Sequence, residues 1–302
     1  MIKMIGFDLD GTLLNSKGEV SRDAIEAIRL ARKYNVKIVI NTGRSVSRVE
    51  EIARSIDGFK YDDFIVTLNG AKVFKFRNDI LTEEKSKPFT EEQIKEIFKK
   101  VNELKLTVFA YGVNGKKSFS NKKASLVTIV MSKYNKLPVE KYDGSTLPTE
   151  LFSKMIIKGS TANMVIFKKF LNKKEYVSSS ASYPKTNPKI LEVTAPGVDK
   201  AHALRIIAKE YEISPKEVAY FGDGENDISA LKWAGHSYAM SNAPDQIKEV
   251  AKFRASSDDG IASEILKFVE EHVDESHSSN TILSDEAAES ADTNVDSSSE
   301  TK

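Results

Sequence analysis

The chain has 302 residues, of which 40% are hydrophobic and 29% are charged, a composition typical of a globular protein with a large buried core. Its lack of cysteine excludes a disulfide framework, a zinc–thiolate site and a cysteine nucleophile. The net charge of +1 does not favour nucleic-acid binding and no apolar stretch is long enough to span a bilayer, so we expect neither a nucleic-acid nor a membrane partner.

The first 80 residues alternate between apolar runs and helical patterns. The opening of the chain lacks the apolar core and cleavage site of a signal peptide, so we expect a cytoplasmic protein. The residue types predict strands and helices in turn, with Ser21 as the N-cap of the first helix. The expected order is strand Lys3–Asp8, helix Ser21–Tyr34, strand Val36–Asn41, helix Val46–Ser55 and strand Phe64–Leu68.

The middle of the chain, residues 81–189, is rich in lysine and does not continue this alternation. We interpret it as a separate α+β domain inserted into the first domain. The expected elements are helix Glu91–Leu104, strands Leu106–Tyr111 and Phe152–Ile157, helix Thr161–Asn172 and strand Glu175–Ser180.

The alternation resumes near residue 190, so the sequence predicts an α/β fold with a doubly wound, mostly parallel (Rossmann-like) sheet. Residues 1–80 and 190–274 would form this core, with residues 81–189 as the insertion. The expected elements are helix Asp199–Tyr211, strand Val218–Phe221, helix Glu225–Trp233, strand Ser237–Met240 and helix Gly260–Val269.

The end of the chain, residues 275–302, contains seven acidic residues and one basic residue, and it has few large apolar side chains. Such a segment cannot bury enough apolar surface to offset the entropy lost on ordering. We therefore predict a disordered acidic tail.

Two carboxylates follow the first expected strand, in the segment Asp8-Leu9-Asp10-Gly11-Thr12. The carboxyl ends of the strands are where ligands bind in open α/β sheets. Crowded carboxylates repel one another unless a cation lies among them, and hard divalent cations prefer oxygen ligands. An acidic surface turn is the alternative, whereas a calcium loop is disfavoured because Leu13 stands where that loop requires glycine.

Two further segments could bind an anion. Asn41-Thr42-Gly43-Arg44-Ser45 places a hydroxyl and a glycine amide between a strand and a helix. Lys200 lies at the start of a helix, where its charge opposes the helix dipole, so a nearby anion would explain its position.

The segment Gly222-Asp223-Gly224-Glu225-Asn226-Asp227 again joins an apolar strand to a helix. Asp223 and Asp227 can complete a metal site, and Asn226 can donate a hydrogen bond to phosphate. Because four polar segments lie at strand ends or helix starts, we expect them to form one site.

Together these segments resemble the four motifs of the haloacid dehalogenase (HAD) superfamily. They are Asp8–Thr12, Thr42–Arg44, Lys200 and Gly222–Asp227. The long interval between the second and third resembles that of the Cof-type, subclass IIB sugar phosphatases, which carry a large α+β cap domain there.

Shorter segments extend the resemblance over residues 1–272. Asn69-Gly70-Ala71 and Leu191–Thr194 are similar to segments of the same subfamily. Ser241 and Ala201 depart from the family pattern, which has glycine at both positions, but neither change removes a side chain that does chemistry.

The resemblance implies a Mg²⁺-dependent phosphatase in which Asp8 forms an aspartyl-phosphate while Asp10 acts as general acid and then as general base. The implied Mg²⁺ ligands are Asp8, Asp10 through its backbone carbonyl, and Asp223, with Asp227 in support. The implied phosphate-binding residues are Leu9, Thr42, Gly43, Lys200 and Asn226. The residues expected to face the substrate or the cap are Arg44, Asn69 and Glu192.

The expected substrate is a small phosphorylated metabolite such as a sugar phosphate, and we expect a monomer or a weak homo-oligomer. A phosphomutase shares the aspartyl-phosphate and is one alternative. A catalytically idle sensor or scaffold is another, which loss of Asp8, Asp10, Lys200 or Asp223 would favour. All four are present.

Overall fold

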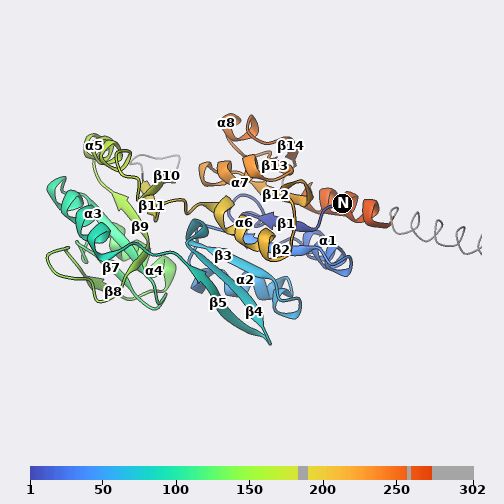
Figure 1. Cartoon of the computed structure of the whole chain (residues 1–302), viewed down its shortest axis with the longest axis horizontal. Helices are drawn as coiled ribbons and strands as arrows, with labels where there is room; N and C mark the ends of the chain where they lie inside the picture. The colour runs from blue at the N-terminus through green and yellow to red at the C-terminus, as the bar shows by residue number, and fades with distance from the viewer. Residues whose placement is uncertain (183–189, 257–259, 274–302) are drawn as a thin grey trace, which may run out of the picture.

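The computed structural model describes residues 1–182, 190–256 and 260–273 (Figure 1). The acidic segment over residues 275–302, for which the sequence predicts disorder, lies outside these residues. Among the described helices, none combines the length and the apolar character needed to cross a membrane.

The larger sheet has eight strands in the order β14-β13-β12-β1-β2-β3-β4-β5. The strands from β14 to β3 are parallel, whereas β4 and β5 join antiparallel at one edge. This arrangement confirms the mostly parallel α/β fold. The strands are β1 (Met4–Phe7), β2 (Lys37–Asn41), β3 (Phe64–Thr67), β4 (Lys72–Arg77), β5 (Ile80–Ser86), β12 (Val218–Gly222), β13 (His236–Met240) and β14 (Phe253–Ala255).

Two apolar clusters cover the two faces of this sheet, because successive strand residues point to opposite faces. Met4 belongs to one cluster with Leu204, and Ile5 belongs to the other with Ile28. Residues 260–273 are helical and contribute Ile265 to the second cluster. The other helices of this part are α1 (Arg22–Lys33), α2 (Glu50–Ser55), α6 (Lys200–Glu210), α7 (Ile228–Trp233) and α8 (Asp245–Lys248).

A second sheet of six strands, in the order β10-β11-β9-β6-β7-β8, forms the inserted domain. It lies on the left of Figure 1, in green and yellow. Its strands are β6 (Thr107–Gly112), β7 (Ser118–Ser120), β8 (Val139–Lys141), β9 (Phe152–Lys158), β10 (Ser178–Ser182) and β11 (Ile190–Thr194). Its helices are α3 (Glu91–Glu103), α4 (Leu126–Asn135) and α5 (Thr161–Leu171).

Some elements begin or end at other residues than the sequence predicts. The helix expected over Val46–Ser55 is divided into a 3-10 turn, η1 (Val46–Arg48), and α2. The helix expected over Glu225–Trp233 is divided in the same way into η5 (Glu225–Asp227) and α7. The expected bounds of the insertion, residues 81–189, also differ from the strand pairing. Because β5 pairs with β4 in the larger sheet and β11 pairs with β9 in the second sheet, we propose that the inserted domain begins after Ser86 and ends at Thr194.

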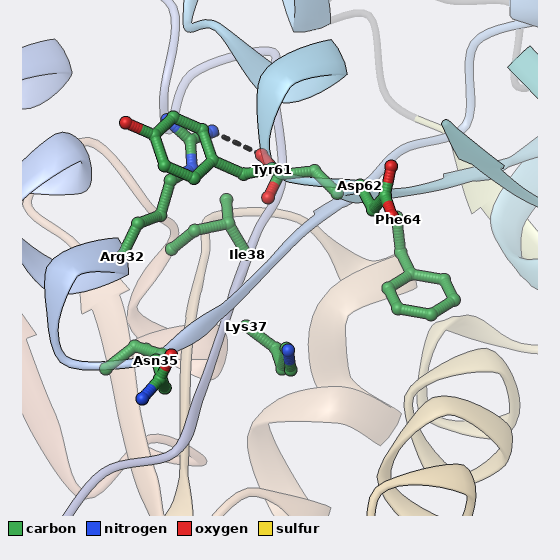
Figure 2. A pocket seen from close by; sticks show the side chains of 9 residues that line it. Arg32, Asn35, Lys37, Ile38, Tyr61, Asp62 and Phe64 are labelled. Atoms are coloured by element: carbon green, nitrogen blue, oxygen red, sulfur yellow. Dashed lines mark hydrogen bonds and ion pairs between the residues drawn. The ribbon is translucent and has the colours of Figure 1, made fainter. Parts of the chain in front are cut away.

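A buried ion pair lies at the edge of the larger sheet where β2 and β3 begin. Arg32 of α1 donates hydrogen bonds to the Asp63 carboxylate and, at 2.6 Å, to the backbone carbonyl of Ile56. Its guanidinium also lies 4.7 Å from the centre of the Tyr61 ring, beside a cavity of about 100 Å³ (Figure 2). This cavity is lined by residues from the starts of β2 and β3, whereas the predicted site residues follow the strand ends.

We predict that Asp63→Ala lowers the free energy of unfolding by about 3–5 kcal/mol, because it leaves the Arg32 charge buried without its partner. Chemical denaturation would measure this. The matched control is Glu26→Ala, which breaks the exposed Arg22–Glu26 pair (2.9 Å) and should cost about 1 kcal/mol or less. Equal effects of the two variants would contradict the prediction.

Candidate active site

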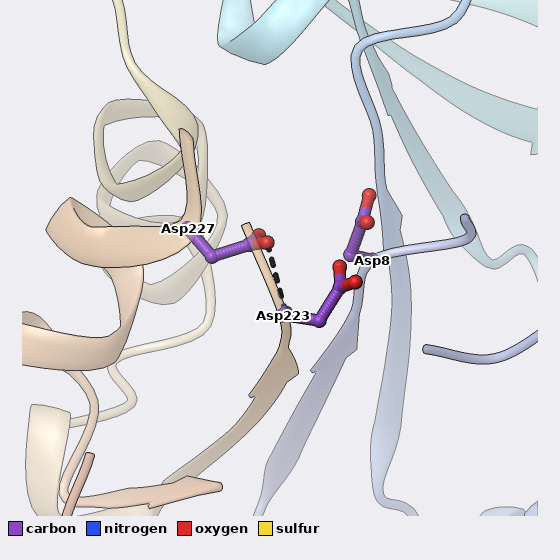
Figure 3. A group of neighbouring side chains, drawn as sticks. All are labelled: Asp8, Asp223 and Asp227. Atoms are coloured by element: carbon purple, nitrogen blue, oxygen red, sulfur yellow. Dashed lines mark hydrogen bonds between the residues drawn. The ribbon is translucent and has the colours of Figure 1, made fainter. Parts of the chain in front are cut away.

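Three carboxylates meet at the carboxyl ends of two neighbouring strands. Asp8 follows β1, and Asp223 and Asp227 follow β12. One carboxylate oxygen from each lies within 4.8 Å of the others (Figure 3). The parallel pairing of β1 with β12 explains why residues more than 200 positions apart in the sequence come together.

Lys200, the first residue of α6, lies between two of these carboxylates. Its ammonium is 2.7 Å from Asp8 Oδ1 and 2.6 Å from Asp227 Oδ1, and its side chain is fully buried. Burial lowers the pKa of Lys200, but the carboxylates of Asp227 and Asp8 raise it by more, so the pKa lies above its usual value. The Asn41 side chain donates a hydrogen bond to the backbone carbonyl of Lys200 at 2.9 Å, and this bond helps to hold the lysine in place.

Asp227 accepts four hydrogen bonds from the protein. Lys200 and the Tyr220 hydroxyl, each at 2.6 Å, donate to Oδ1. The backbone amides of Asp223 at 3.2 Å and Gly224 at 2.9 Å donate to Oδ2. A carboxylate has about four acceptor positions. The geometry therefore suits Asp227 to hold Lys200 and the β12 loop rather than to bind an ion directly.

The other two carboxylates have acceptor capacity for an ion. Burial raises the pKa of Asp8 to about 7, although Lys200 opposes this, and burial together with Asp227 raises the pKa of Asp223 to about 6. Three carboxylates and one ammonium would carry a net charge of −2 when ionised. Hard carboxylate oxygens at this spacing, with excess negative charge, fit a divalent cation such as Mg²⁺.

Asp10 lies at the mouth of the site, where its side chain is 59% exposed. Arg44 donates two hydrogen bonds to its carboxylate, one of them from Nε at 2.8 Å. The two carboxylates of the first motif therefore differ, because Asp8 is buried against Lys200 and Asp10 is exposed and paired with Arg44.

The loop after β2 brings the backbone close to Asn69. A Cβ atom added to Gly43 would lie 2.8 Å from Asn69 Oδ1, so a larger residue would displace the Asn69 side chain. Thr42 is buried, and its carbonyl accepts a hydrogen bond from the Asn69 amide at 3.0 Å. Leu9 is also buried, within the apolar core, so only its backbone is available to a ligand.

Asn226, Asn69 and Glu192 lie in one hydrogen-bonded group. Asn226 donates to Asn69 Oδ1 at 3.2 Å, and Asn69 donates to the Glu192 carboxylate. Lys154 of β9 pairs with the same carboxylate at 2.9 Å. A cavity of about 400 Å³ opens beside this group and Lys200, and it is also lined by α7.

The sequence did not identify three residues of this site. Tyr220 resembled an ordinary core residue of an apolar strand. Lys154 lies within the apolar strand Phe152–Lys158, and a charged residue in such a strand could have indicated a functional role. Asn242, which donates to the Gly11 carbonyl at 2.9 Å and to Asp223 at 3.1 Å, lies in a segment to which the resemblance gave no role.

Comparison with known proteins finds relatives and solved structures that are named as phosphatases. Relatives include a 5-amino-6-(5-phospho-D-ribitylamino)uracil phosphatase, YcsE, of Bacillus subtilis, which is 29% identical over 270 residues and covers 89% of this chain and 96% of the relative. A solved HAD phosphatase from Bacteroides thetaiotaomicron is 25% identical, with a TM-score of 0.73 over 89% of this chain and 95% of its own.

A solved subclass IIB sugar phosphatase is 22% identical, with a TM-score of 0.70 over 88% of this chain and 98% of its own, and this likeness shows a shared fold. The model of one family, described as haloacid dehalogenase-like hydrolase, matches residues 5–265. The chain therefore belongs to the haloacid dehalogenase-like hydrolases.

Proposed function

We propose that this protein is a Mg²⁺-dependent phosphatase that hydrolyses small phosphomonoesters through an aspartyl-phosphate on Asp8. The observation that carries the proposal is the burial of Asp8 beside Lys200 and two further carboxylates, at the strand ends. Two similar proteins are named for small phosphorylated substrates, one a phosphorylated ribitylaminouracil and the other a sugar phosphate. These names support a small phosphorylated metabolite as the substrate.

In the first step, an Asp8 oxygen would attack phosphorus while the bond from phosphorus to the leaving alcohol breaks. Asp10 would donate a proton to the leaving oxygen. Lys200 would balance negative charge on the phosphoryl oxygens, and Thr42, the Gly43 amide and Asn226 would orient them. Such positioning and charge neutralisation supply most of the catalysis in phosphoryl transfer.

In the second step, a water molecule would attack the aspartyl-phosphate and release inorganic phosphate, which restores the Asp8 carboxylate. Asp10 would now accept the proton of the water. Arg44, which pairs with the Asp10 carboxylate, would hold this side chain in place for the step.

Asp8, Asp223 and the backbone carbonyl of Asp10 would hold the Mg²⁺ ion, with Asp227 acting through Lys200 and the β12 loop. The ion would neutralise charge on the phosphoryl oxygens. We further propose that the protein acts in the cytoplasm as a monomer or a weak homo-oligomer.

We predict that Asp8→Asn lowers phosphate release by at least ~10³-fold, because an amide cannot form the covalent intermediate. The measurement is phosphate release from a panel of phosphorylated metabolites, with and without Mg²⁺, by wild type and variant. Circular dichroism should show the same fold for both proteins. Release by the purified variant near the wild-type rate would contradict the mechanism, and transfer to a second sugar hydroxyl instead of water would identify a mutase.

We also predict that Mg²⁺ binds more weakly below about pH 7. The pKa of Asp8 is raised to about 7 and that of Asp223 to about 6, so their protonated fractions increase as pH falls and protons compete with the ion. Calorimetry should give an affinity at pH 6 about tenfold below that at pH 8. Asp8→Asn should flatten this dependence, and an affinity that is constant from pH 6 to pH 8 in the wild type would refute the prediction.

A further inference from the structure

Lys154 belongs to the inserted domain, yet its ammonium lies against the loop that follows β2 in the core. Its Nζ atom is 3.1 Å from the Gly43 carbonyl oxygen and 2.9 Å from Glu192 Oε1. The side chain is only 1% exposed. Burial of an ammonium is costly unless charge and hydrogen-bond partners compensate for it, and here Glu192 supplies the charge and Gly43 a hydrogen bond.

A local irregularity in β9 directs this side chain toward the core. The register of β9 against β6 shifts between Tyr111 and Gly112, so that β9 has one additional residue at this point. Phe152 can therefore pack with Phe98 in the core of the inserted domain, at a ring distance of 5.8 Å, while Lys154 reaches Gly43. Bulges of this kind commonly re-aim side chains near functional sites.

Glu192 connects Lys154 to Asn69 and, through Asn69, to Asn226. One of its oxygens pairs with Lys154, and the other accepts a hydrogen bond from Asn69. Asn69 in turn accepts from Asn226 at 3.2 Å. These five residues, here named the Lys154 cluster, begin at Gly43 and end at Asn226, and both ends are proposed phosphate-binding residues.

The inserted domain also contacts other residues of the segment that follows β2. Ser45 Oγ donates to Asn135 Oδ1 at 3.1 Å, and Ser47 Oγ donates to the Asn135 carbonyl at 2.8 Å. Arg48 lies over the Tyr134 ring at 4.6 Å. Residues 43–48 are therefore held by the inserted domain, and Lys154 makes the contact nearest the phosphate-binding amide.

We propose that Lys154 is a positioning residue, which aligns Gly43 and Asn226 around the phosphoryl group when the inserted domain is docked. The proposal rests on the proposed function, because it gives these two residues a role in the transition state. Lys154 acts through the Gly43 carbonyl and through Glu192, and docking of the inserted domain is what brings its charge to the site.

The test variant is Lys154→Met, which keeps the length of the side chain and removes its charge. With p-nitrophenyl phosphate and saturating Mg²⁺, kcat should fall about 10- to 100-fold, less than the ~10²–10³-fold loss that follows removal of a direct donor. KM should change by less than about threefold, since the misplaced groups act mainly in the transition state.

Two further variants separate positioning from stability. Lys154→Met also leaves Glu192 buried without its cation and should lower the Tm, whereas the double variant Lys154→Met with Glu192→Gln should regain Tm but not kcat. Lys158→Met is the matched control, because Lys158 lies on the same strand and makes no ion pair or side-chain hydrogen bond within the described residues. It should keep the wild-type kcat.

Hydrogen exchange provides a readout that needs no turnover. Amides of residues 42–46 should exchange several-fold faster in Lys154→Met than in wild type or Lys158→Met, because the loop loses its contact with the inserted domain. A kcat within twofold of wild type, a double variant that regains kcat, or unchanged exchange would each overturn the proposal. If the wild type hydrolyses no substrate, the proposed function fails, while the exchange result still decides whether Lys154 orders the loop.

Discussion

The buried ammonium of Lys200 is the group around which the site is arranged. Asp8 and Asp227 both contact it, at 2.7 and 2.6 Å, and neither carboxylate could be buried at this position without a compensating charge. Asp227 is fixed by Tyr220 and two backbone amides, so it fixes Lys200, and Lys200 fixes Asp8. The position of the proposed nucleophile is therefore set by groups on three segments that are far apart in the sequence.

The remaining negative charge has a chemical consequence. Burial is the main cause of the raised pKa values of Asp8 and Asp223, and neighbouring carboxylates add to it. One ammonium cannot balance three carboxylates. A divalent cation would remove this excess and lower both pKa values, which would leave Asp8 ionised at neutral pH. Under the proposed function, metal binding and formation of the reactive carboxylate would therefore be coupled.

The sequence predicted the parallel sheet and the convergence of the four motifs, because strand ends and acidic turns are local features of the chain. It did not predict α4, whose apolar Leu126 and Val130 are exposed and give no clear amphipathic pattern. It also missed Lys154, since the partner that neutralises this lysine lies on another strand and the bulge that directs it depends on pairing with β6. Ion pairs and bulges that depend on pairing between distant strands cannot be predicted from a single sequence.

Several contacts between the two parts of the chain lie at the segment for which we propose phosphate binding. The contacts at Gly43, Ser45, Ser47 and Arg48 lie in the segment that follows β2, and they are polar or cation–π. Leu68 and Ala71 of the core add a small apolar contact, because they belong to the apolar cluster of the inserted domain. Interfaces between domains that lack a large apolar area allow relative motion. An inserted domain held in this way can leave the core to admit a substrate, and its return would re-form the contacts of Gly43. The loop that binds phosphate would then be aligned only when the substrate is enclosed, which would limit hydrolysis to molecules that both parts of the protein accept.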